Sequence, residues 1–377
     1  MLEQLYTIKR LTSTRIAKEL NVDSSKVVSL FSKLKKDDGI IVKPEVLYAA
    51  YGLNRIIIEI PGLILLKPKD RPLRSALFIR SIYNIIPHNV LHITLDTPIE
   101  CERISSILHE LTYNCILDSI GSRPKILYLY TAIRGDYQTL LDPEKIEDIL
   151  YKPPLKLYPK KRKIDGVDLD ILQVMSKYPF LKQRHLKQKL KEKYKEETYA
   201  SRRNEIVLTG NLNRHIEHAE YLIRGYRVSQ IKRVTKDSQF QIIYRSKCVK
   251  PEDAALRMST HPLVPGTAII KTNYDEKLLQ VAIFVPRGYY GQAQDFFLTV
   301  HEKLRCKIID SMIMDQASKL IFTSGARITG EYDSRTRWKE LDYNEIVVLL
   351  RKLVDAGILK WLRRPPEWWY REVEVPV

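Results

Sequence analysis

The hydrophobic pattern of this chain changes period repeatedly, and this alternation limits the fold more than any other feature of the sequence. From Leu2 to about Pro44 the apolar residues follow helical spacing, whereas residues 51–150 contain short β-branched runs typical of strands. From residue 165 onward the same order returns, with helical spacing first and strand–helix–strand segments after it. The sequence therefore predicts an α+β protein with an internal duplication at the level of architecture.

Predicted boundaries follow these changes of pattern. We expect a first helical unit at 1–50, a first α/β domain at 51–150, a basic linker at 151–164, a second helical unit at 165–247, a second α/β domain at 248–330, and a C-terminal helix with a β-ribbon around Pro365-Pro366 at 331–377. The linker carries three prolines and six basic residues between positions 152 and 163, a composition typical of a stiff, extended connection.

Each α/β domain is predicted to be a ferredoxin-like sandwich. In the first, we expect strands in "RIIIEI" (55–60), "NVLHITL" (89–95) and "KILYLYTAI" (125–133), and helices in 72–86 and 100–112. In the second, we expect strands in 267–273, 279–285, 307–314 and 318–325 around a helix at 291–304.

Charge points to a polyanionic partner. The formal net charge is +18 and the sequence pI is near 9.5. Residues 152–203 hold 16 Lys and Arg against 6 Asp and Glu, so the excess is concentrated on the linker and the second helical unit. The alternative is a solvated basic surface of a heat-adapted protein.

The cysteines and the apolar runs indicate a cytoplasmic protein. Four cysteines are spread along the chain without a C-x-x-C pair, which argues against a disulfide framework or a zinc ribbon. The N-terminus lacks the apolar core of a signal peptide, and no stretch approaches the length of a membrane span. We expect localisation in the cytoplasm, associated with the nucleoid.

In the first helical unit, the helix after Asp23 has one buried and one exposed face. Val27, Leu30, Phe31 and Leu34 follow helical spacing. The residues left outside are Ser24, Ser25, Lys26, Ser29 and Lys33. Small hydroxyls and lysines at a helix N-terminus suit close approach to a phosphate backbone.

The segment "RIAKELNVDSSKVVSLFSKLKKDDGIIVKPEV" resembles the N-terminal winged helix–turn–helix of the Lrp/AsnC (feast/famine) transcription regulators. The resemblance covers roughly the first 135 residues and implies a DNA-reading helix followed by a RAM-like α/β domain for assembly. Two departures are visible: the loop "LKKDDG" is one residue longer than usual, and "DTPIE" stands where the family has an effector-binding glycine turn. We therefore expect no amino-acid effector.

The second helical unit contains "NLNRHIEHAEYLIRGYRV", from Asn211 to Val228. Helical spacing predicts a second reading helix over 209–223, ended by Gly225, and "YRVSQIKRV" is predicted to be the basic strand of a wing. The predicted DNA contacts in this unit are Asn211, Asn213, Arg214, His215, His218, Arg227, Lys232 and Arg233. Phosphate contacts from the linker are predicted at Lys160, Lys161, Arg162 and Lys163.

Other interpretations of the two histidines stay open. A metal site needs a third ligand, for which only Glu217 and Glu220 lie nearby in sequence. A catalytic site needs an orienting acid and a nucleophile or pocket, which show no recognisable spacing here. The histidines also fit ordinary solvated polar positions. Base contacts remain favoured because Arg pairs with guanine and Asn with adenine.

Together these patterns predict a sequence-selective regulator that binds double-stranded DNA through two winged-helix units. We expect no enzymatic activity, because the common nucleotide-binding and hydrolase motifs are missing from the sequence, and no cofactor or metal. Expected partners are double-stranded DNA, a second copy bound through the α/β domains, and RNA polymerase, with no membrane. The alternatives are a non-enzymatic factor that binds RNA polymerase, the ribosome or another protein, or a non-specific chromatin protein.

The C-terminal "WLRRPPEWWYREV" holds three of the four tryptophans. It predicts a small core or a dimer contact, with stacking on bases as the alternative. The preceding segment has a helix that ends at Gly357 and a strand after it, an order similar to that of a third winged helix.

Overall fold

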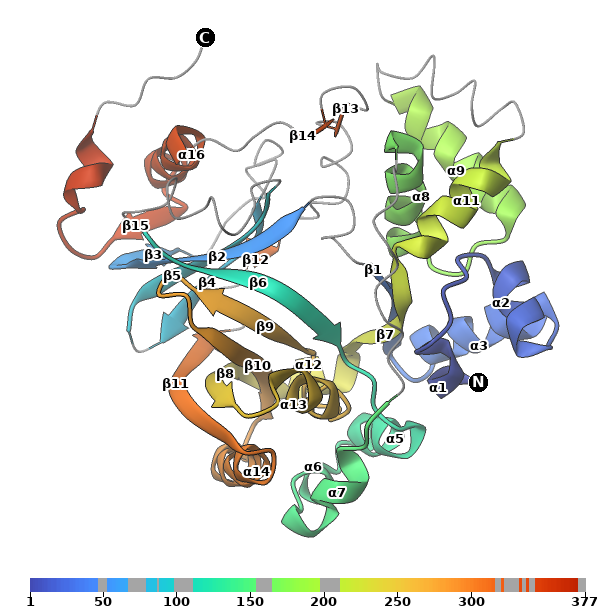
Figure 1. Cartoon of the computed structure of the whole chain (residues 1–377), viewed down its shortest axis with the longest axis horizontal. Helices are drawn as coiled ribbons and strands as arrows, with labels where there is room; N and C mark the ends of the chain where they lie inside the picture. Colours follow the sequence, from blue (N-terminus) through green and yellow to red (C-terminus); the bar gives the residue numbers. More distant parts are fainter. Residues whose placement is uncertain are drawn as a thin grey trace.

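A computed structural model of the chain describes residues 1–46, 53–66, 79–86, 88–97, 111–153, 165–196, 211–315, 320–321, 332–333, 337–338 and 343–371. Its centre is a β-barrel (Figure 1). Two helical units lie together on one side of the barrel, and the C-terminal helix α16 lies on the opposite side.

Among the described residues, both helical units have three helices followed by a strand. The first comprises α1 (Leu2–Leu5), α2 (Ser13–Leu20), α3 (Ser24–Lys36) and β1 (Ile40–Val46). The second comprises α8 (Gly166–Lys177), α9 (Gln183–Glu196), α11 (Leu212–Tyr221) and β7 (Ile223–Ile231). Helix α8 starts at a capping box, in which the Asp165 side chain accepts backbone N–H groups and the Asp168 side chain accepts the Asp165 N–H.

The barrel has eight antiparallel strands, four from each half of the chain. The first half contributes β2 (Asn54–Pro61), β4 (Ile79–Ile86), β5 (Val90–Thr97) and β6 (Thr112–Gly121). The second half contributes β8 (Ser238–Cys248), β9 (Gly266–Thr272), β10 (Lys277–Pro286) and β11 (Cys306–Asp315). Their order is β11-β8-β10-β9-β6-β2-β5-β4, and the barrel closes where Ile313 and Met314 of β11 pair with Ile86 and Ile85 of β4.

Successive side chains along each strand point alternately to the outer face of the barrel and to its interior. On β2, Ile56 and Ile58 face outward into a buried cluster with Val347 and Leu350 of α16 (Tyr343–Asp355). On the other half, α13 (Pro251–Met258) and α14 (Tyr290–Lys303) cover the outer face. Residues between these outward positions therefore point into the barrel, where Tyr83, Ile85, Ile243, Met312 and Met314 form an apolar part of its filling.

The two helical units are joined directly. Strands β1 and β7 pair antiparallel, from Ile40 opposite Ile231 to Val46 opposite Ile223. Gly225 lies in this ribbon with φ +152°, and a Cβ at this position would lie 2.0 Å from the carbonyl oxygen of Tyr6. Glycine is therefore required here by close backbone approach, and it does not end a helix as the sequence suggested.

The predicted fold class is wrong in its central feature. The two α/β segments do not form separate ferredoxin-like sandwiches, because their strands close one common barrel. The helical units are not two independent winged helices either: β1 and β7 pair with each other, and the predicted second wing continues into the helix α12 (Lys232–Asp237). Long-range strand pairing of this kind is not encoded in local periodicity, which explains the error.

Several predicted elements also change type. Residues 79–86 of the predicted helix 72–86 form strand β4, and the rest of that segment lies outside the described residues. The predicted strand 125–133 is helix α5 (Ile126–Arg134), in which Tyr128, Leu129 and Ala132 are buried at helical spacing. Further short helices follow: α6 (Tyr137–Leu140), η2 (Pro143–Lys145) and α7 (Ile146–Ile149). Most of the predicted helix 100–112 lies outside the described residues.

The C-terminal segment forms a small core against the barrel. Strand β15 (Leu359–Trp361) pairs with β3 (Leu63–Leu65), so the predicted ribbon around the two prolines is wrong, and a 3-10 turn, η3 (Glu367–Tyr370), follows. Trp361, Trp368 and Trp369 contact one another edge to face, with ring centroids 5.1 to 6.3 Å apart. Three short strands, β12 (Leu320–Ile321), β13 (Tyr332–Asp333) and β14 (Arg337–Trp338), complete the described elements.

Two further observations concern the covalent and membrane predictions. Cys248 and Cys306, paired across β8 and β11, form a disulfide, although the spacing of the cysteines argued against a disulfide framework. Within the described ranges, no helix combines the length and apolarity that a bilayer crossing needs.

Candidate functional site

Four titratable or polar side chains meet inside the barrel, and we call them the barrel cluster: Glu59, Tyr83, His92 and Arg245. Glu59 on β2 and Tyr83 on β4 both pair in register with His92 on β5. Arg245 lies on β8, which is not a neighbour of β2 in the barrel. A direct contact between Arg245 and Glu59 must therefore cross the barrel interior.

Arg245 holds the cluster together. Its guanidinium donates to both carboxylate oxygens of Glu59, at 3.2 Å for Oε2, and its Nε donates to Gln280 Oε1 at 3.1 Å. His92 Nδ1 lies 3.4 Å from Glu59 Oε1, and the imidazole stacks on the Tyr83 ring with centroids 4.2 Å apart. The cluster thus places an imidazole, a carboxylate, a phenol and a guanidinium in one buried space.

The protonation states follow from this environment. Burial acts to raise the pKa of Glu59, but the hydrogen bonds from His92 and Arg245 outweigh it and bring the pKa down to about 2. Burial also raises the pKa of Tyr83 far above its usual value. At neutral pH the cluster therefore contains an ionised carboxylate and a protonated phenol next to His92.

A second polar group lies on the same inner face. Arg55 Nε on β2 donates to Asp96 Oδ1 on β5 at 2.7 Å, and the Asp96 side chain is fully buried. Asn114 on the neighbouring strand β6 is buried, and its amide nitrogen has no hydrogen-bond partner among the described residues. Polar groups buried at this density in a barrel are costly to stability, which is typical of functional sites.

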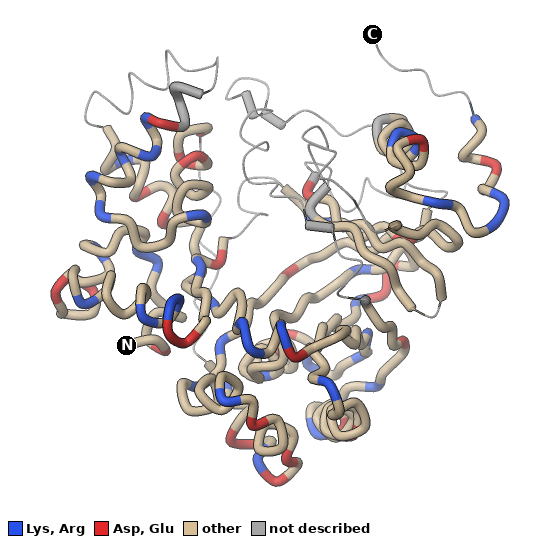
Figure 2. Tube along the Cα trace, turned by 180° about the vertical axis from the view of Figure 1, so that it is seen from behind, with Lys and Arg blue, Asp and Glu red and all other residues tan. Residues whose placement is uncertain are grey.

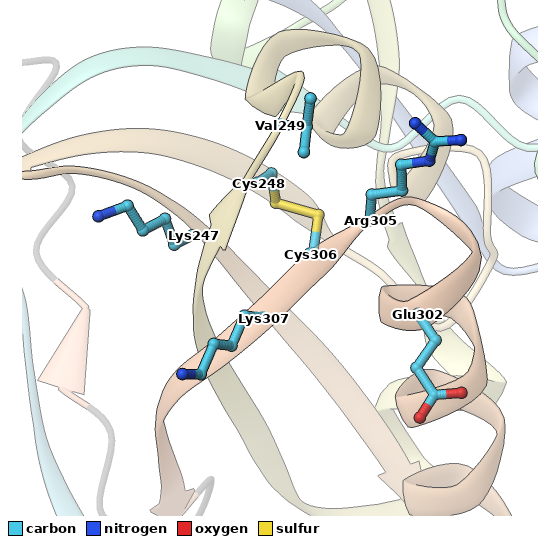
Figure 3. A pocket seen from close by; sticks show the side chains of 7 residues that line it. All are labelled: Lys247, Cys248, Val249, Glu302, Arg305, Cys306 and Lys307. Atoms are coloured by element: carbon cyan, nitrogen blue, oxygen red, sulfur yellow. A yellow bond between two sulfur atoms is a disulfide. The ribbon is translucent and has the colours of Figure 1, made fainter.

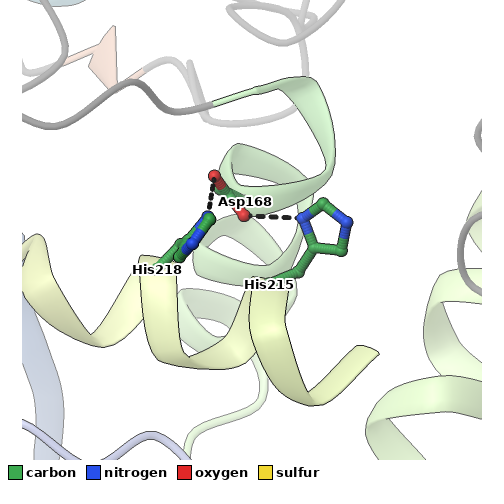
Figure 4. Close-up of side chains that lie close together, drawn as sticks. All are labelled: Asp168, His215 and His218. Carbon is green, nitrogen blue, oxygen red and sulfur yellow. Dashed lines mark hydrogen bonds and ion pairs between the residues drawn. The ribbon is translucent and has the colours of Figure 1, made fainter. Parts of the chain in front are cut away.

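A separate cluster lies in the second helical unit, and we call it the helical cluster: Asp168, His215 and His218 (Figure 4). Asp168 lies in the first turn of α8, and the two histidines lie one turn apart on α11. His215 Nδ1 is 2.9 Å from Asp168 Oδ1, and His218 Nδ1 is 3.6 Å from Asp168 Oδ2. Asp165 Oδ1 lies 3.5 Å from His215 Nδ1.

His215 and Asp168 of the helical cluster shift each other's pKa. The hydrogen bond with Asp168 raises the pKa of His215. Burial raises the pKa of Asp168 and outweighs the opposing hydrogen bond from His215. Sequence spacing revealed the two histidines, but Asp168 is 47 residues earlier than His215 and was missed.

A DNA-binding surface requires exposed side chains, and only some of the predicted DNA-contact residues are exposed. Ser25, Lys26, Ser29 and Lys33 are exposed on α3, whereas Ser24 is half-buried. Asn213 and Arg214 are exposed on α11, and so is Asn211 at its N-cap. His215 is buried and turned to Asp168, and His218 also faces that carboxylate. Arg227 is half-buried in β7, while Lys232 and Arg233 are exposed on α12. The four linker residues 160–163 lie outside the described residues.

The remaining acidic residues of α11 serve contacts inside the protein. Glu220 is buried and accepts hydrogen bonds from Arg10 at 2.8 Å and Arg15 at 3.1 Å, both in the first helical unit. Glu217 accepts from Arg15. Neither glutamate belongs to the helical cluster. Figure 2 shows basic and acidic positions interspersed over the helical units and around the barrel.

A shallow pocket of about 630 Å³ lies at the disulfide (Figure 3). Its lining residues are Lys247, Cys248, Val249, Glu302, Arg305, Cys306 and Lys307. Basic side chains outnumber the single glutamate, and in the close-up the side chains of Lys247 and Lys307 extend to one side of the disulfide while Glu302 lies on the other. The pocket therefore offers no convergent set of polar groups comparable to the two clusters.

Comparison with known proteins gives little that is close. No family model matches the chain, and no curated protein is similar to it. One similar solved structure is "Crystal structure of the siroheme decarboxylase NirDL", with a TM-score of 0.43 and 11% identity, covering 94% of this chain and 97% of that chain. Another is the same enzyme "in co-complex with iron-uroporphyrin III analogue", with a TM-score of 0.40, 10% identity and coverage of 95% and 97%.

These findings correct the predicted identity. The interpretation as a non-enzymatic, Lrp/AsnC-type DNA-binding regulator is wrong: strands from both halves of the chain close one barrel, and β1 pairs with β7, so the chain does not contain two independent winged-helix readers. The proposed reading helix is also engaged internally through His215 and Glu220. The interaction-factor and chromatin alternatives fail with it. At these TM-scores the similarity transfers no activity to this chain.

Proposed function

We propose that this chain is an enzyme that binds a small carboxylate-bearing substrate at the barrel cluster and transfers a proton to or from it. The observation that carries the proposal is the convergence of His92, Glu59 and Arg245 from both halves of the chain inside one barrel. Histidine beside a carboxylate is the common arrangement for a general acid or base, because the carboxylate orients the imidazole.

Arg245 is the residue suited to recognise the substrate. A guanidinium binds a carboxylate through two parallel N–H donors, and Arg245 already holds Glu59 in this way. A substrate carboxylate of the same chemistry would exchange for Glu59. Arg245 also lies 3.7 Å from Asp310, whose side chain is 46% exposed, so this end of the cluster is the one nearest to solvent.

Within such a complex the other residues have separate tasks. Glu59, whose Oε1 lies 3.4 Å from His92 Nδ1, would accept the imidazole N–H and orient the ring. His92 would move the proton, and the stacked Tyr83 ring would keep the imidazole plane in place. Perturbed protonation in a group of this kind supports a catalytic role.

The first test is ligand binding to the full chain. We would measure the unfolding temperature of the wild type with a panel of mono- and polycarboxylates, and then the affinity of any stabilising compound by calorimetry. Siroheme belongs in the panel because the two similar structures carry its name; their weak similarity adds no support to the proposal.

A matched pair of variants decides the outcome. Arg245→Gln should weaken binding of the carboxylate by tenfold or more, whereas Arg287→Gln, at an exposed arginine, should leave it unchanged. His92→Asn should bind the ligand but lose turnover. The proposal fails if no carboxylate binds the wild type, or if Arg245→Gln binds it equally well.

A further inference from the structure

We propose that Asp168, His215 and His218 bind one divalent transition-metal ion of the zinc type, at a site separate from the barrel cluster. One ligand atom from each residue lies within 4.8 Å of the others. The donors come from two helices, α8 and α11, that are packed together through Leu172, Ile216 and Ala219. The inference does not depend on the proposed function.

The distances suit a metal ion. Tetrahedral zinc with bonds of about 2.0–2.1 Å places its ligand atoms roughly 3.3 Å apart. His215 Nδ1 lies 2.9 Å from Asp168 Oδ1 and His218 Nδ1 lies 3.6 Å from Asp168 Oδ2, so each imidazole is close to that value from one oxygen of the carboxylate. Because one ligand atom from each residue already lies within 4.8 Å of the others, rotations of the three side chains would bring these atoms to tetrahedral distances.

Donor chemistry selects the kind of ion. Two imidazoles and one carboxylate match zinc, cobalt, nickel and ferrous iron, whereas calcium and magnesium prefer oxygen donors alone. Three protein ligands leave at least one coordination position open. Asp165 lies on the same side, 3.5 Å from His215, and adds a second negative charge that favours a cation.

The surroundings already orient the ligands. Asp168 Oδ2 accepts the backbone N–H of Asp165 at 3.1 Å, and this contact belongs to the capping box of α8. Hydrogen bonds that fix a ligand in this way increase metal affinity. The Asp168 side chain is almost fully buried, and the His218 side chain is 26% exposed, so an ion can enter from the His218 side.

Metal binding would have a structural consequence. An ion at this position would link the start of α8 to α11, and α11 is itself tied to the first helical unit through Glu220. We therefore expect the ion to stabilise the joined helical units.

The experiment uses the full chain without an affinity tag, freed of metal by chelation and dialysis. Zinc is titrated by calorimetry, and cobalt by its visible absorption, whose intensity reports four-coordination. We expect one ion per chain and a higher unfolding temperature with zinc.

Variants test which residues bind. His218→Gln and Asp168→Asn should each lower zinc affinity by tenfold or more, and the control His185→Gln, at an exposed histidine of α9, should behave like the wild type. Because His218 is partly exposed, its variant should keep the fold even if Asp168→Asn does not. Absence of zinc binding by the wild type, or equal binding by His218→Gln, would overturn the proposal.

Discussion

The guanidinium of Arg245 on β8 binds the carboxylate of Glu59 on β2 across the barrel, between residues that are 186 positions apart in the sequence. This ion pair links the two halves of the chain at the place where the imidazole of His92 is held. It is therefore at once a structural contact and the centre of the proposed active site.

Replacing only Arg245 or only Glu59 should lower the free energy of unfolding more than replacing both residues. Arg245→Met leaves the Glu59 carboxylate buried without its cation, and losses of about 3–5 kcal/mol are typical for such a change. The double variant Glu59→Gln with Arg245→Met should recover part of that loss. Urea unfolding of the wild type, both single variants and the double variant gives the coupling energy. A coupling near zero would contradict the role of the pair.

Acid should remove the contribution of Glu59. Its pKa is lowered from an ordinary value of 4.5 to about 2 in the folded chain, so the stabilisation is complete above pH 4.5 and is lost as the pH falls toward 2. Two to three pKa units correspond to roughly 3 kcal/mol. The difference in unfolding free energy between the wild type and Glu59→Gln should therefore shrink from pH 6 to pH 3. A constant difference would mean that the carboxylate is not ionised in the fold.

His261 should produce a pH dependence at milder acidity. It is fully buried; its Nε2–H donates to the Leu140 carbonyl and its Nδ1 accepts the Leu263 N–H, so the ring must be neutral. Burial lowers its pKa from 6.5 to about 4.

The unfolded chain therefore binds the proton more readily, and stability should fall as the pH drops from 6.5 toward 4. His261→Gln should flatten this slope, whereas His88→Gln, at an exposed position, should keep it. Urea unfolding at three pH values makes the comparison, and an unchanged slope in His261→Gln would refute it.

Glu220 should matter more than its neighbour Glu217. It is buried, binds both Arg10 and Arg15, and also accepts the backbone N–H of Leu11. Glu220→Gln should cost about 1–3 kcal/mol, because charged hydrogen bonds are lost inside the protein. Glu217 is exposed, so Glu217→Gln should change stability by less than about 1 kcal/mol. Equal effects of the two variants would show that α11 does not depend on this contact.

Gly225→Ala should be among the most damaging small substitutions in the chain. The added Cβ would lie 2.0 Å from the Tyr6 carbonyl oxygen, and φ is +152°, so both sterics and backbone geometry oppose it. We expect a loss of several kcal/mol, at the upper end of single-residue effects. Gly291→Ala on α14 is the control, since a Cβ added at this position would have no atom within 4 Å among those considered. Thermal unfolding measures both, and similar unfolding temperatures would exclude the close approach.

The helices were more predictable than the barrel. Helices α2, α3 and α8 follow from apolar residues at helical spacing, which is a local signal. Closure of the barrel depends on Ile313 pairing with Ile86, more than 200 residues away, and no local pattern contains that information. The run 125–133 is rich in Leu and Tyr, which are found in both helices and strands. It forms a helix because this places its apolar residues against the rest of the protein.

The candidate sites show the same limit. The sequence revealed His215 and His218 because they lie one turn apart, but their partner Asp168 comes from another helix. Glu59 stands alone in an isoleucine-rich strand and His92 alternates with apolar residues, but neither was predicted as a site residue, because a single polar residue in a strand does not reveal its partners. Arg245 comes from the other half of the chain, and only the fold brings it to them.

Pairing of β1 with β7 has a consequence during synthesis. Residues 40–46 leave the ribosome long before residues 223–231, so the first helical unit must wait for its partner strand. At about 5–20 residues per second, this delay is on the order of 10 to 40 s. During that time the edge of β1 is open to other strands, and shielding by a chaperone would be most valuable before the chain passes residue 231.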